Sequence, residues 1–294
     1  MKTLDDFGLT GSLVALVTPM HADGALDESA WTRLLDWHAE AGTDGVIVGG
    51  TTGESVSLRA EERDRLLEHA LERIGDRVRV IAGTGAAATA AAIEQSRRAA
   101  ALGAHAVLVV TPYYNRPPQR GLAAHYRAIA EACAAPLILY NVPGRTAVDL
   151  APETTIELAG HERIVGIKEA VADMGRVRHL VEAGVGVLSG DDPTARAAID
   201  AGAVGVISVA ANIVPDRFAA MCHAALDGRR DRAEAIDAEL RPLYRFLGIE
   251  SNPVPAKWLL AELGRIDSGI RLPLVPLDDA HHETGRALLR SLTG

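Results

Sequence analysis

The sequence predicts an α/β protein, a (β/α)8 TIM barrel with a C-terminal three-helix extension. Short apolar runs rich in β-branched residues alternate with longer amphipathic segments, which implies parallel strands joined by helical crossovers. The runs are apolar throughout, as expected for strands covered on both faces, and eight of them is the number that closes such a barrel. The alternative is an open doubly wound sheet, which usually has a glycine-rich phosphate turn after its first strand. Thr18-Pro19-Met20 is not such a turn.

The elements follow one another at regular intervals. The predicted strands are Leu13–Val17, Gly45–Val48, Val78–Ala82, Ala106–Val110, Leu137–Tyr140, Ile164–Lys168, Val185–Leu188 and Val204–Val209. The amphipathic segments between them predict helices, among them Asp27–Ala41, Arg59–Ile74, Thr89–Leu102 and Gln119–Ala134. The barrel is then complete by about Leu226, so we expect a catalytic barrel domain over residues 1–227.

Residues 228–294 predict the helical extension, which is too small to fold alone and is expected to pack on the barrel. Its expected helices are Arg230–Phe246, Pro253–Leu263 and Asp278–Ser291. Proline-containing segments at 250–255 and 272–276 separate them.

Composition narrows the class of partner. A net charge of −9 argues against a nucleic acid or an anionic membrane, both of which need a basic face. No apolar run reaches the ~18 residues of a membrane span, and the N-terminus does not resemble a signal peptide. Cys133 and Cys222, on separate predicted helices, are expected to be reduced and buried, which favours a cytoplasmic protein. The histidines lie away from the strand ends, so no metal site is expected.

Lysine is rare in this chain, and one of the lysines lies at the end of a predicted buried strand. Only Lys2, Lys168 and Lys257 are lysines, and the other 27 of the 30 basic residues are arginines. Lys168 ends a buried strand, where an arginine could neither lose its proton nor act as a nucleophile. The structural alternative is a strand-end lysine held in a salt bridge, for which Glu169 is the nearest acid.

Other polar side chains follow the predicted strands at the carboxyl end, where barrel active sites lie. Singly, each has a structural explanation: glycines for turns, hydroxyls for caps and aspartates for helix starts, and we expect the last of these for Asp191 and Asp192. Their shared rim is what suggests a site. The segments are Gly49–Glu54, Thr111–Asn115, Tyr140–Thr146, Lys168 and Ser189–Asp192.

Four of these motifs together resemble the dihydrodipicolinate synthase family of pyruvate-dependent class I aldolases. They are Gly50-Thr51-Thr52-Gly53-Glu54, Pro112-Tyr113-Tyr114-Asn115, Tyr140-Asn141-Val142-Pro143-Gly144-Arg145-Thr146 and Gly166-Ile167-Lys168-Glu169. The resemblance runs from Gly11 to Leu274. It implies a Schiff-base condensation of pyruvate with L-aspartate 4-semialdehyde to 4-hydroxy-tetrahydrodipicolinate, in lysine and diaminopimelate biosynthesis. It implies no cofactor beyond the covalent imine, and a homotetramer built from tight dimers.

The resemblance also implies a role for each matching residue. Lys168 would form the imine, Thr51 and Thr52 would hold the pyruvate carboxylate, and Arg145 would bind the carboxylate of the semialdehyde. Thr51, Tyr140 and Tyr114 would relay protons, with Tyr114 supplied by a neighbouring subunit. Gly190 and Ile207 would line the pyruvate site.

One part of the family pattern is missing, and two other functions stay open. Lysine-inhibited members carry polar side chains where this chain has Ala60, Arg63, Ala87 and Ala91, so lysine inhibition is expected to be weak or absent. The first alternative is another aldolase of the superfamily that acts on 2-keto-3-deoxy sugar acids, against which Arg145 argues. The second is a non-catalytic pyruvate-binding or scaffold protein, against which the intact lysine, tyrosines and threonine argue.

Overall fold

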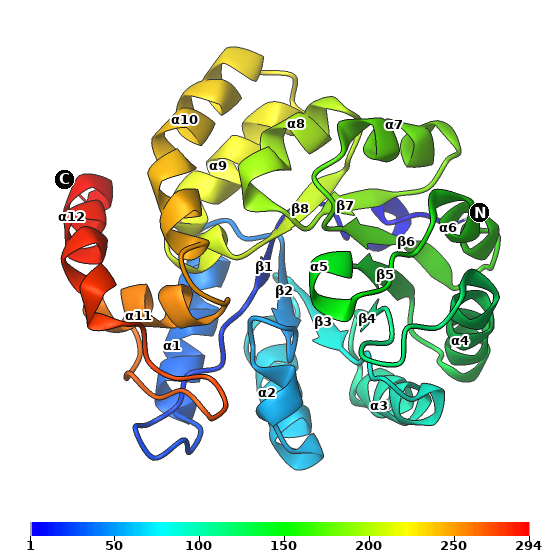
Figure 1. Cartoon of the computed structure of the whole chain (residues 1–294), viewed down its shortest axis with the longest axis horizontal. Coiled ribbons are helices and arrows are strands. Elements are labelled where there is room, and N and C mark those ends of the chain that lie inside the picture. Colours follow the sequence, from blue (N-terminus) through cyan, green and yellow to red (C-terminus); the bar gives the residue numbers. More distant parts are fainter. Residues whose placement is uncertain (1, 294) are drawn as a thin grey trace.

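A closed barrel of eight parallel strands forms the centre of the computed structural model, which describes residues 2–293 (Figure 1). The strands pair in chain order, and β8 closes the barrel on β1. This confirms the predicted (β/α)8 class. The strands are β1 Gly11–Ala15, β2 Gly45–Val48, β3 Arg79–Gly83, β4 Ala106–Val110, β5 Leu137–Asn141, β6 Ile164–Glu169, β7 Val187–Ser189 and β8 Gly205–Ser208.

Helices surround the strands and cover their outer face (Figure 1). They are α1 Glu28–Glu40, α2 Ala60–Ile74, α3 Thr89–Leu102, α4 Gln119–Ala132, α6 Pro152–Ala159, α7 Met174–Glu182, α8 Ala195–Asp200 and α9 Pro215–Leu226, with a single-turn helix α5 at Pro143–Thr146. The free thiols Cys133 and Cys222 are both buried. Cys222 lies on α9, but Cys133 follows the last residue of α4, which ends two residues earlier than the sequence predicted.

Two apolar layers fill the protein on either side of the sheet. The inner layer closes the barrel interior with large side chains from successive strands, including Leu13, Ile47, Ile81, Leu108, Ile138 and Ile207. The outer layer joins the alternate strand side chains and the apolar faces of the helices in one cluster, which includes Val14 and Val46 of the strands and Trp31 and Leu34 of α1. Because each strand is buried on both faces, its sequence is a continuous apolar run rather than an alternating one.

Some strand bounds differ from those that the apolar runs predicted. The first strand was expected at Leu13–Val17 and begins at Gly11 instead, where it pairs with Gly205 of β8. A Cβ at Gly205 would lie only 2.4 Å from the carbonyl oxygen of Gly11, so this pairing needs a glycine. Apolar periodicity cannot detect such a position, because a glycine carries no side chain to bury.

The C-terminal helices lie together on one side of the barrel (Figure 1). They are α10 Arg230–Leu247, α11 Val254–Glu262 and α12 His282–Thr293, and α10 packs along α9. The segment after α11 is tied back by Arg271, whose guanidinium binds the Glu62 carboxylate of α2 at 2.7 and 2.8 Å and lowers the pKa of Glu62 to about 2. The division of the chain at residue 227 into a barrel domain and an extension stays a prediction.

Within residues 2–293, the structure contains no helix with both the length and the apolar character that a membrane crossing requires.

Candidate active site

A lysine and a tyrosine face each other at the carboxyl end of the barrel strands. Lys168 of β6 and Tyr140 of β5 are register partners, and the Lys168 Nζ lies 4.3 Å from the centre of the Tyr140 ring. The lysine is 5% exposed although it carries an ionisable amine. The position of the amine over the aromatic ring is a favourable cation–π contact. This contact involves neither a covalent bond nor an ion pair of the amine.

Gly190 and Ile207 also lie in this region of the barrel. A Cβ at Gly190 would come within 2.8 Å of the Lys168 Cε, so only glycine leaves the lysine side chain its present position. Ile207 is buried in the same interior layer as Tyr140 and Leu188. The structure therefore places Gly190 against the lysine side chain and Ile207 in the barrel interior.

The acid next to Lys168 in sequence is bound elsewhere. Glu169 receives the Arg176 Nε of α7 at 2.8 Å, the Asn141 Nδ2 at 3.0 Å and the backbone N–H of Val171 at 3.0 Å. No hydrogen bond or ion pair holds the Lys168 amine anywhere in residues 2–293. The structural alternative considered above, a Lys168–Glu169 salt bridge, is therefore wrong.

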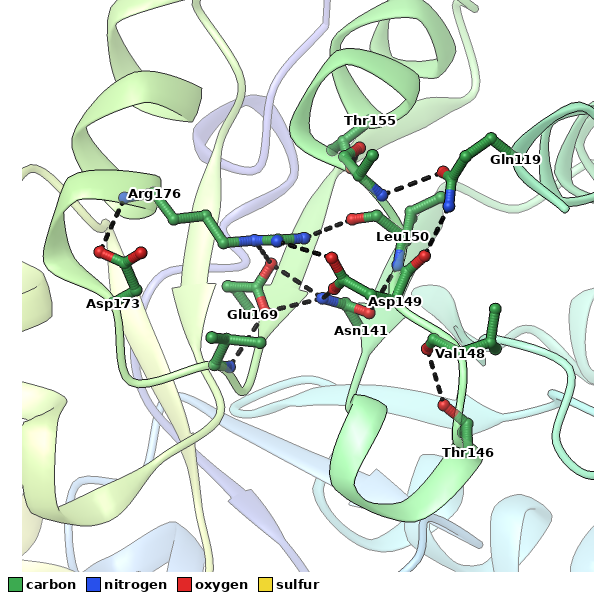
Figure 2. Close-up of polar contacts among 12 residues, drawn as sticks. Gln119, Asn141, Thr146, Val148, Asp149, Leu150, Thr155, Glu169, Asp173 and Arg176 are labelled. Atoms are coloured by element: carbon green, nitrogen blue, oxygen red, sulfur yellow. Dashed lines mark hydrogen bonds and ion pairs between the residues drawn. The ribbon is translucent and has the colours of Figure 1, made fainter. Parts of the chain in front are cut away.

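Figure 2 shows the network that occupies Glu169. Arg176 reaches from α7 to Glu169 and also to the Asp149 carboxylate at 3.0 Å, while Asn141 joins Asp149 at 2.7 Å and accepts from the Leu150 N–H at 3.0 Å. Asn141 and Glu169 directly follow Tyr140 and Lys168 in their strands. The network therefore ties together the ends of β5 and β6 that carry the tyrosine and the lysine.

The same network also determines the electrostatic environment of the Glu169 carboxyl, which is next to Lys168 in the chain. Burial raises the pKa of the Glu169 carboxyl, and the Arg176 guanidinium acts against that shift. A buried carboxylate that has several donors and an arginine partner has little remaining electrostatic attraction for a further cation. Sequence reasoning missed this network, because Arg176 lies on a helix whose polar residues resemble any solvated face.

The turn that contains Thr51 and Thr52 follows β2, and hydrogen bonds to the next residues, Gly53 and Glu54, hold it in place. The Thr18 hydroxyl donates to the Gly53 carbonyl at 2.8 Å, and Thr52 is only 2% exposed. Glu54 adopts a left-handed conformation at φ 56°, which is uncommon outside glycine. Its carboxylate accepts from the Lys257 Nζ at 2.5 Å and from the Arg271 N–H at 3.1 Å. Neither threonine caps a helix.

The two buried lysines therefore differ in kind. The Lys257 amine is bound to Glu54; burial lowers its pKa, and the carboxylate opposes that shift. The Lys168 amine has only the tyrosine ring beside it. A nucleophilic amine must be free of such a partner, a condition that the Lys168 amine meets and the Lys257 amine does not. Because lysine is rare in this chain, the sequence alone could have singled out Lys257 as well as Lys168, and Lys257 as a structural group.

Arg145 and Tyr114 lie farther out on the rim. Arg145 is exposed on α5, and its Nη2 donates to the backbone carbonyl of Asn252 at 3.3 Å. Tyr114 is 94% exposed and has a positive φ of 74°. No hydrogen bond connects the side chains of Thr51, Tyr140 and Tyr114 within the described chain, and the relay stays a prediction.

The prediction that Asp191 and Asp192 cap the next helix is wrong. Asp191 accepts from the Thr194 hydroxyl at 2.6 Å, and no N–H of the following helix reaches its side chain. Asp192 crosses to the turn after β8, where its carboxylate accepts from the N–H groups of Val209 at 3.0 Å and Ala210 at 2.7 Å. It thereby fixes the loop that follows Ile207, because two adjacent N–H groups there point at one buried carboxylate.

A cavity of about 170 Å³ lies between α2 and α3, outside the barrel mouth. It is lined by Ala60, Arg63 and Ala91, three of the positions where lysine-inhibited members are expected to carry polar side chains. The Arg63 guanidinium donates to Gln95 at 2.9 Å. Asp64, another lining residue, is paired with Arg98.

A closed (β/α)8 barrel whose mouth holds a buried amine with no ion-pair partner in residues 2–293 is the arrangement expected of a barrel enzyme with a nucleophilic lysine. In the described residues, no group of three histidine, cysteine, aspartate and glutamate side chains is placed to hold a metal ion. The sequence matches the family model described as the dihydrodipicolinate synthetase family over residues 8–292. The chain belongs to this family.

Individual relatives agree with that assignment. A 4-hydroxy-tetrahydrodipicolinate synthase of Stenotrophomonas maltophilia is 52% identical over 277 residues, which are 93% of each chain. The pyruvate complex of the chloride-inhibited dihydrodipicolinate synthase from Acinetobacter baumannii has a TM-score of 0.94 at 46% identity, covering 96% of this chain and 98% of that one. A structure described as a monomeric dihydrodipicolinate synthase variant has a TM-score of 0.93 at 38% identity, covering 96% of both chains.

Proposed function

We propose that this enzyme condenses pyruvate with L-aspartate 4-semialdehyde to give 4-hydroxy-tetrahydrodipicolinate, a step of lysine and diaminopimelate biosynthesis. The observation that carries the proposal is the free Lys168 amine against Tyr140 at the barrel mouth, in a chain 52% identical to a curated synthase. Pyruvate supplies a ketone for that amine, and a Schiff base is the reaction that a buried, unpaired lysine favours.

The first half-reaction prepares a carbon nucleophile. The Lys168 nitrogen attacks the pyruvate ketone, and loss of water from the carbinolamine gives a protonated imine. The imine draws electrons from the neighbouring methyl group, which loses a proton to become an enamine. Tyr140, whose ring lies beside the amine, would carry these protons, and Thr51 and Thr52 would hold the pyruvate carboxylate in the turn after β2.

The second half-reaction forms the carbon–carbon bond and releases the enzyme. The enamine carbon attacks the aldehyde carbon of the semialdehyde, whose oxygen takes a proton to become a hydroxyl group. The amino group of the same substrate then attacks the imine carbon, closes the ring and displaces the Lys168 amine. Arg145 would bind the semialdehyde carboxylate, because a guanidinium matches a carboxylate with two parallel hydrogen bonds.

A direct comparison of substrates tests this function. Purified protein should consume aspartate semialdehyde with pyruvate and should neither form nor cleave 2-keto-3-deoxy sugar acids at a comparable rate. Faster turnover of a sugar acid would favour the other aldolase function. Absence of any reaction and of any pyruvate imine would favour a non-catalytic pyruvate-binding or scaffold protein.

Substitution of Arg145 should separate the two half-reactions. We expect Arg145→Ala to lose condensation by roughly ten- to hundredfold, because a charge-assisted pair contributes about 1.5–3 kcal/mol. Imine formation with pyruvate should stay near the wild-type level, since the lysine is untouched. Steady-state kinetics with the semialdehyde and mass spectrometry of the trapped imine measure the two effects. Normal handling of the semialdehyde by this variant would remove Arg145 from the site.

Lysine should inhibit this enzyme weakly or not at all. The cavity between α2 and α3 presents Ala60 and Ala91 together with the Arg63 guanidinium, which repels an ammonium group. Of its two lining acids, Asp64 is paired with Arg98, and only Glu94 has no ion pair within residues 2–293. An ammonium cannot leave water without compensating partners. Titration of the condensation rate with lysine checks this expectation. Half-maximal inhibition at sub-millimolar lysine would show that other residues build an effector site.

We propose a homotetramer of tight dimers, supported by the outward-facing Tyr114 next to the half-buried Tyr113. A monomeric variant is known among the relatives, and sedimentation of the purified protein distinguishes a tetramer from a monomer.

The reaction as written needs no cofactor, so EDTA should leave the rate unchanged. The buried free thiols support a cytoplasmic location.

A further inference from the structure

One residue of the C-terminal segment contacts both candidate carboxylate-binding positions. Asn252 lies between α10 and α11, and its Nδ2 donates to the Thr52 Oγ1 at 2.9 Å. The backbone carbonyl of the same residue accepts from the Arg145 Nη2 at 3.3 Å. Thr52 lies in the loop after β2 and Arg145 on the single-turn helix α5 after β5, so Asn252 bridges two segments that follow strands which are not neighbours in the barrel.

In the hydrogen bond between Asn252 and Thr52, the identity of the donor decides whether the threonine hydroxyl can still donate its own proton. A threonine hydroxyl has one proton to donate and two lone pairs that accept. An amide N–H that donates to Thr52 occupies a lone pair and leaves the single hydroxyl proton available. A hydroxyl that accepts one hydrogen bond also becomes a better donor in the next. Resting on the proposed function, we infer that Asn252 is a positioning residue that directs the Thr52 hydroxyl proton toward the pyruvate carboxylate.

The surroundings of the amide support a specific task. Thr52 is the single hydrogen-bond partner of the Asn252 side chain in residues 2–293, and the Asn252 Oδ1 is buried with no partner there. A buried acceptor without a donor is costly, and such a cost is typical of sites where geometry serves function. The orphan oxygen is accounted for if the N–H side of the amide must face the hydroxyl.

The turn itself does not depend on Asn252 for its position. Glu54 is bound by Lys257 and by the Arg271 N–H, and Thr18 holds the Gly53 carbonyl. Loss of the Asn252 amide should therefore change the direction of one hydroxyl proton rather than release the loop. Arg145 should keep its partner in side-chain variants, because that partner is the main-chain oxygen of residue 252.

Two substitutions of nearly opposite chemistry test this inference. Asn252→Ala removes the donor and should raise the pyruvate KM roughly two- to tenfold. Asn252→Asp has the same shape but only acceptors, so it should take the Thr52 proton and place a negative charge near the pyruvate carboxylate. We expect its pyruvate KM to rise at least about tenfold beyond that of Asn252→Ala. The semialdehyde KM should change little in Asn252→Ala.

The Thr52→Val background supplies the control. If Asn252 acts through the hydroxyl, Asn252→Ala should add almost nothing to the pyruvate KM once Thr52 is valine. The inference is overturned if Asn252→Asp is as mild as or milder than Asn252→Ala, or if the two substitutions add independently. A uniform loss of kcat with a lowered melting temperature, and no change in KM, would likewise show a purely structural residue. Failure of the proposed function would appear separately, as a wild-type protein that forms no imine.

Discussion

Lys168→Ala should abolish condensation, with a loss of roughly a thousandfold or more in kcat, because the variant has no amine to form the imine. Lys168→Arg is the matched variant, since it keeps the positive charge over the Tyr140 ring but cannot act as a nucleophile. Both variants should be equally inactive and should bind pyruvate without a covalent adduct. Steady-state rates and intact-protein mass spectrometry after borohydride treatment measure the two quantities.

The melting temperature of each variant separates chemistry from folding. Because the Lys168 amine has no acid partner in residues 2–293, neither substitution leaves a buried acid without its cation, so neither variant should unfold. Substantial condensation by a well-folded Lys168→Arg protein would contradict covalent catalysis through this residue.

Tyr114→Phe should be nearly inactive as a pure protein and should regain activity when mixed with Lys168→Ala. Tyr114 is 94% exposed and shares no hydrogen bond with Thr51 or Tyr140 in the described chain, so its hydroxyl is available to a second subunit. In a reciprocal two-fold dimer, one site of each hybrid combines an intact lysine with an intact tyrosine. Random exchange of equal amounts should restore about a quarter of the wild-type sites.

The control for this experiment is the same mixture without subunit exchange, in which activity should stay at the level of the single variants. Native mass spectrometry establishes that hybrids have formed. Proven hybrids that show no recovery would mean that Tyr114 serves its own barrel, and a fully active Tyr114→Phe protein would mean that it serves none.

The barrel could be predicted from sequence because every strand is buried on two faces. Gly45–Val48 and Ala106–Val110 were predicted to the residue, since both runs are apolar and end at polar or glycine positions. The first strand was displaced by two residues, because its pairing with β8 depends on glycines that approach each other closely. Strand order followed from the alternation of strand and helix.

The candidate site was predictable only as far as strand ends define a rim. Lys168 and Tyr140 followed from their positions at strand ends and Gly190 from the family resemblance, and the structure brings these three residues together. Contacts between distant segments were not predictable: Asn252 and Thr52 are 200 residues apart, and Asp192 reaches a turn 17 residues away instead of its own helix. Such contacts depend on how loops fold over the rim, and no local pattern specifies this.

Identification of the trapped lysine decides whether Lys168 forms the covalent intermediate. Wild-type protein incubated with pyruvate should be reduced with borohydride, digested and mapped by mass spectrometry. We expect one reduced pyruvate adduct, on the peptide that contains Lys168. An adduct on Lys257, or an active enzyme that yields no adduct, would contradict imine formation by Lys168.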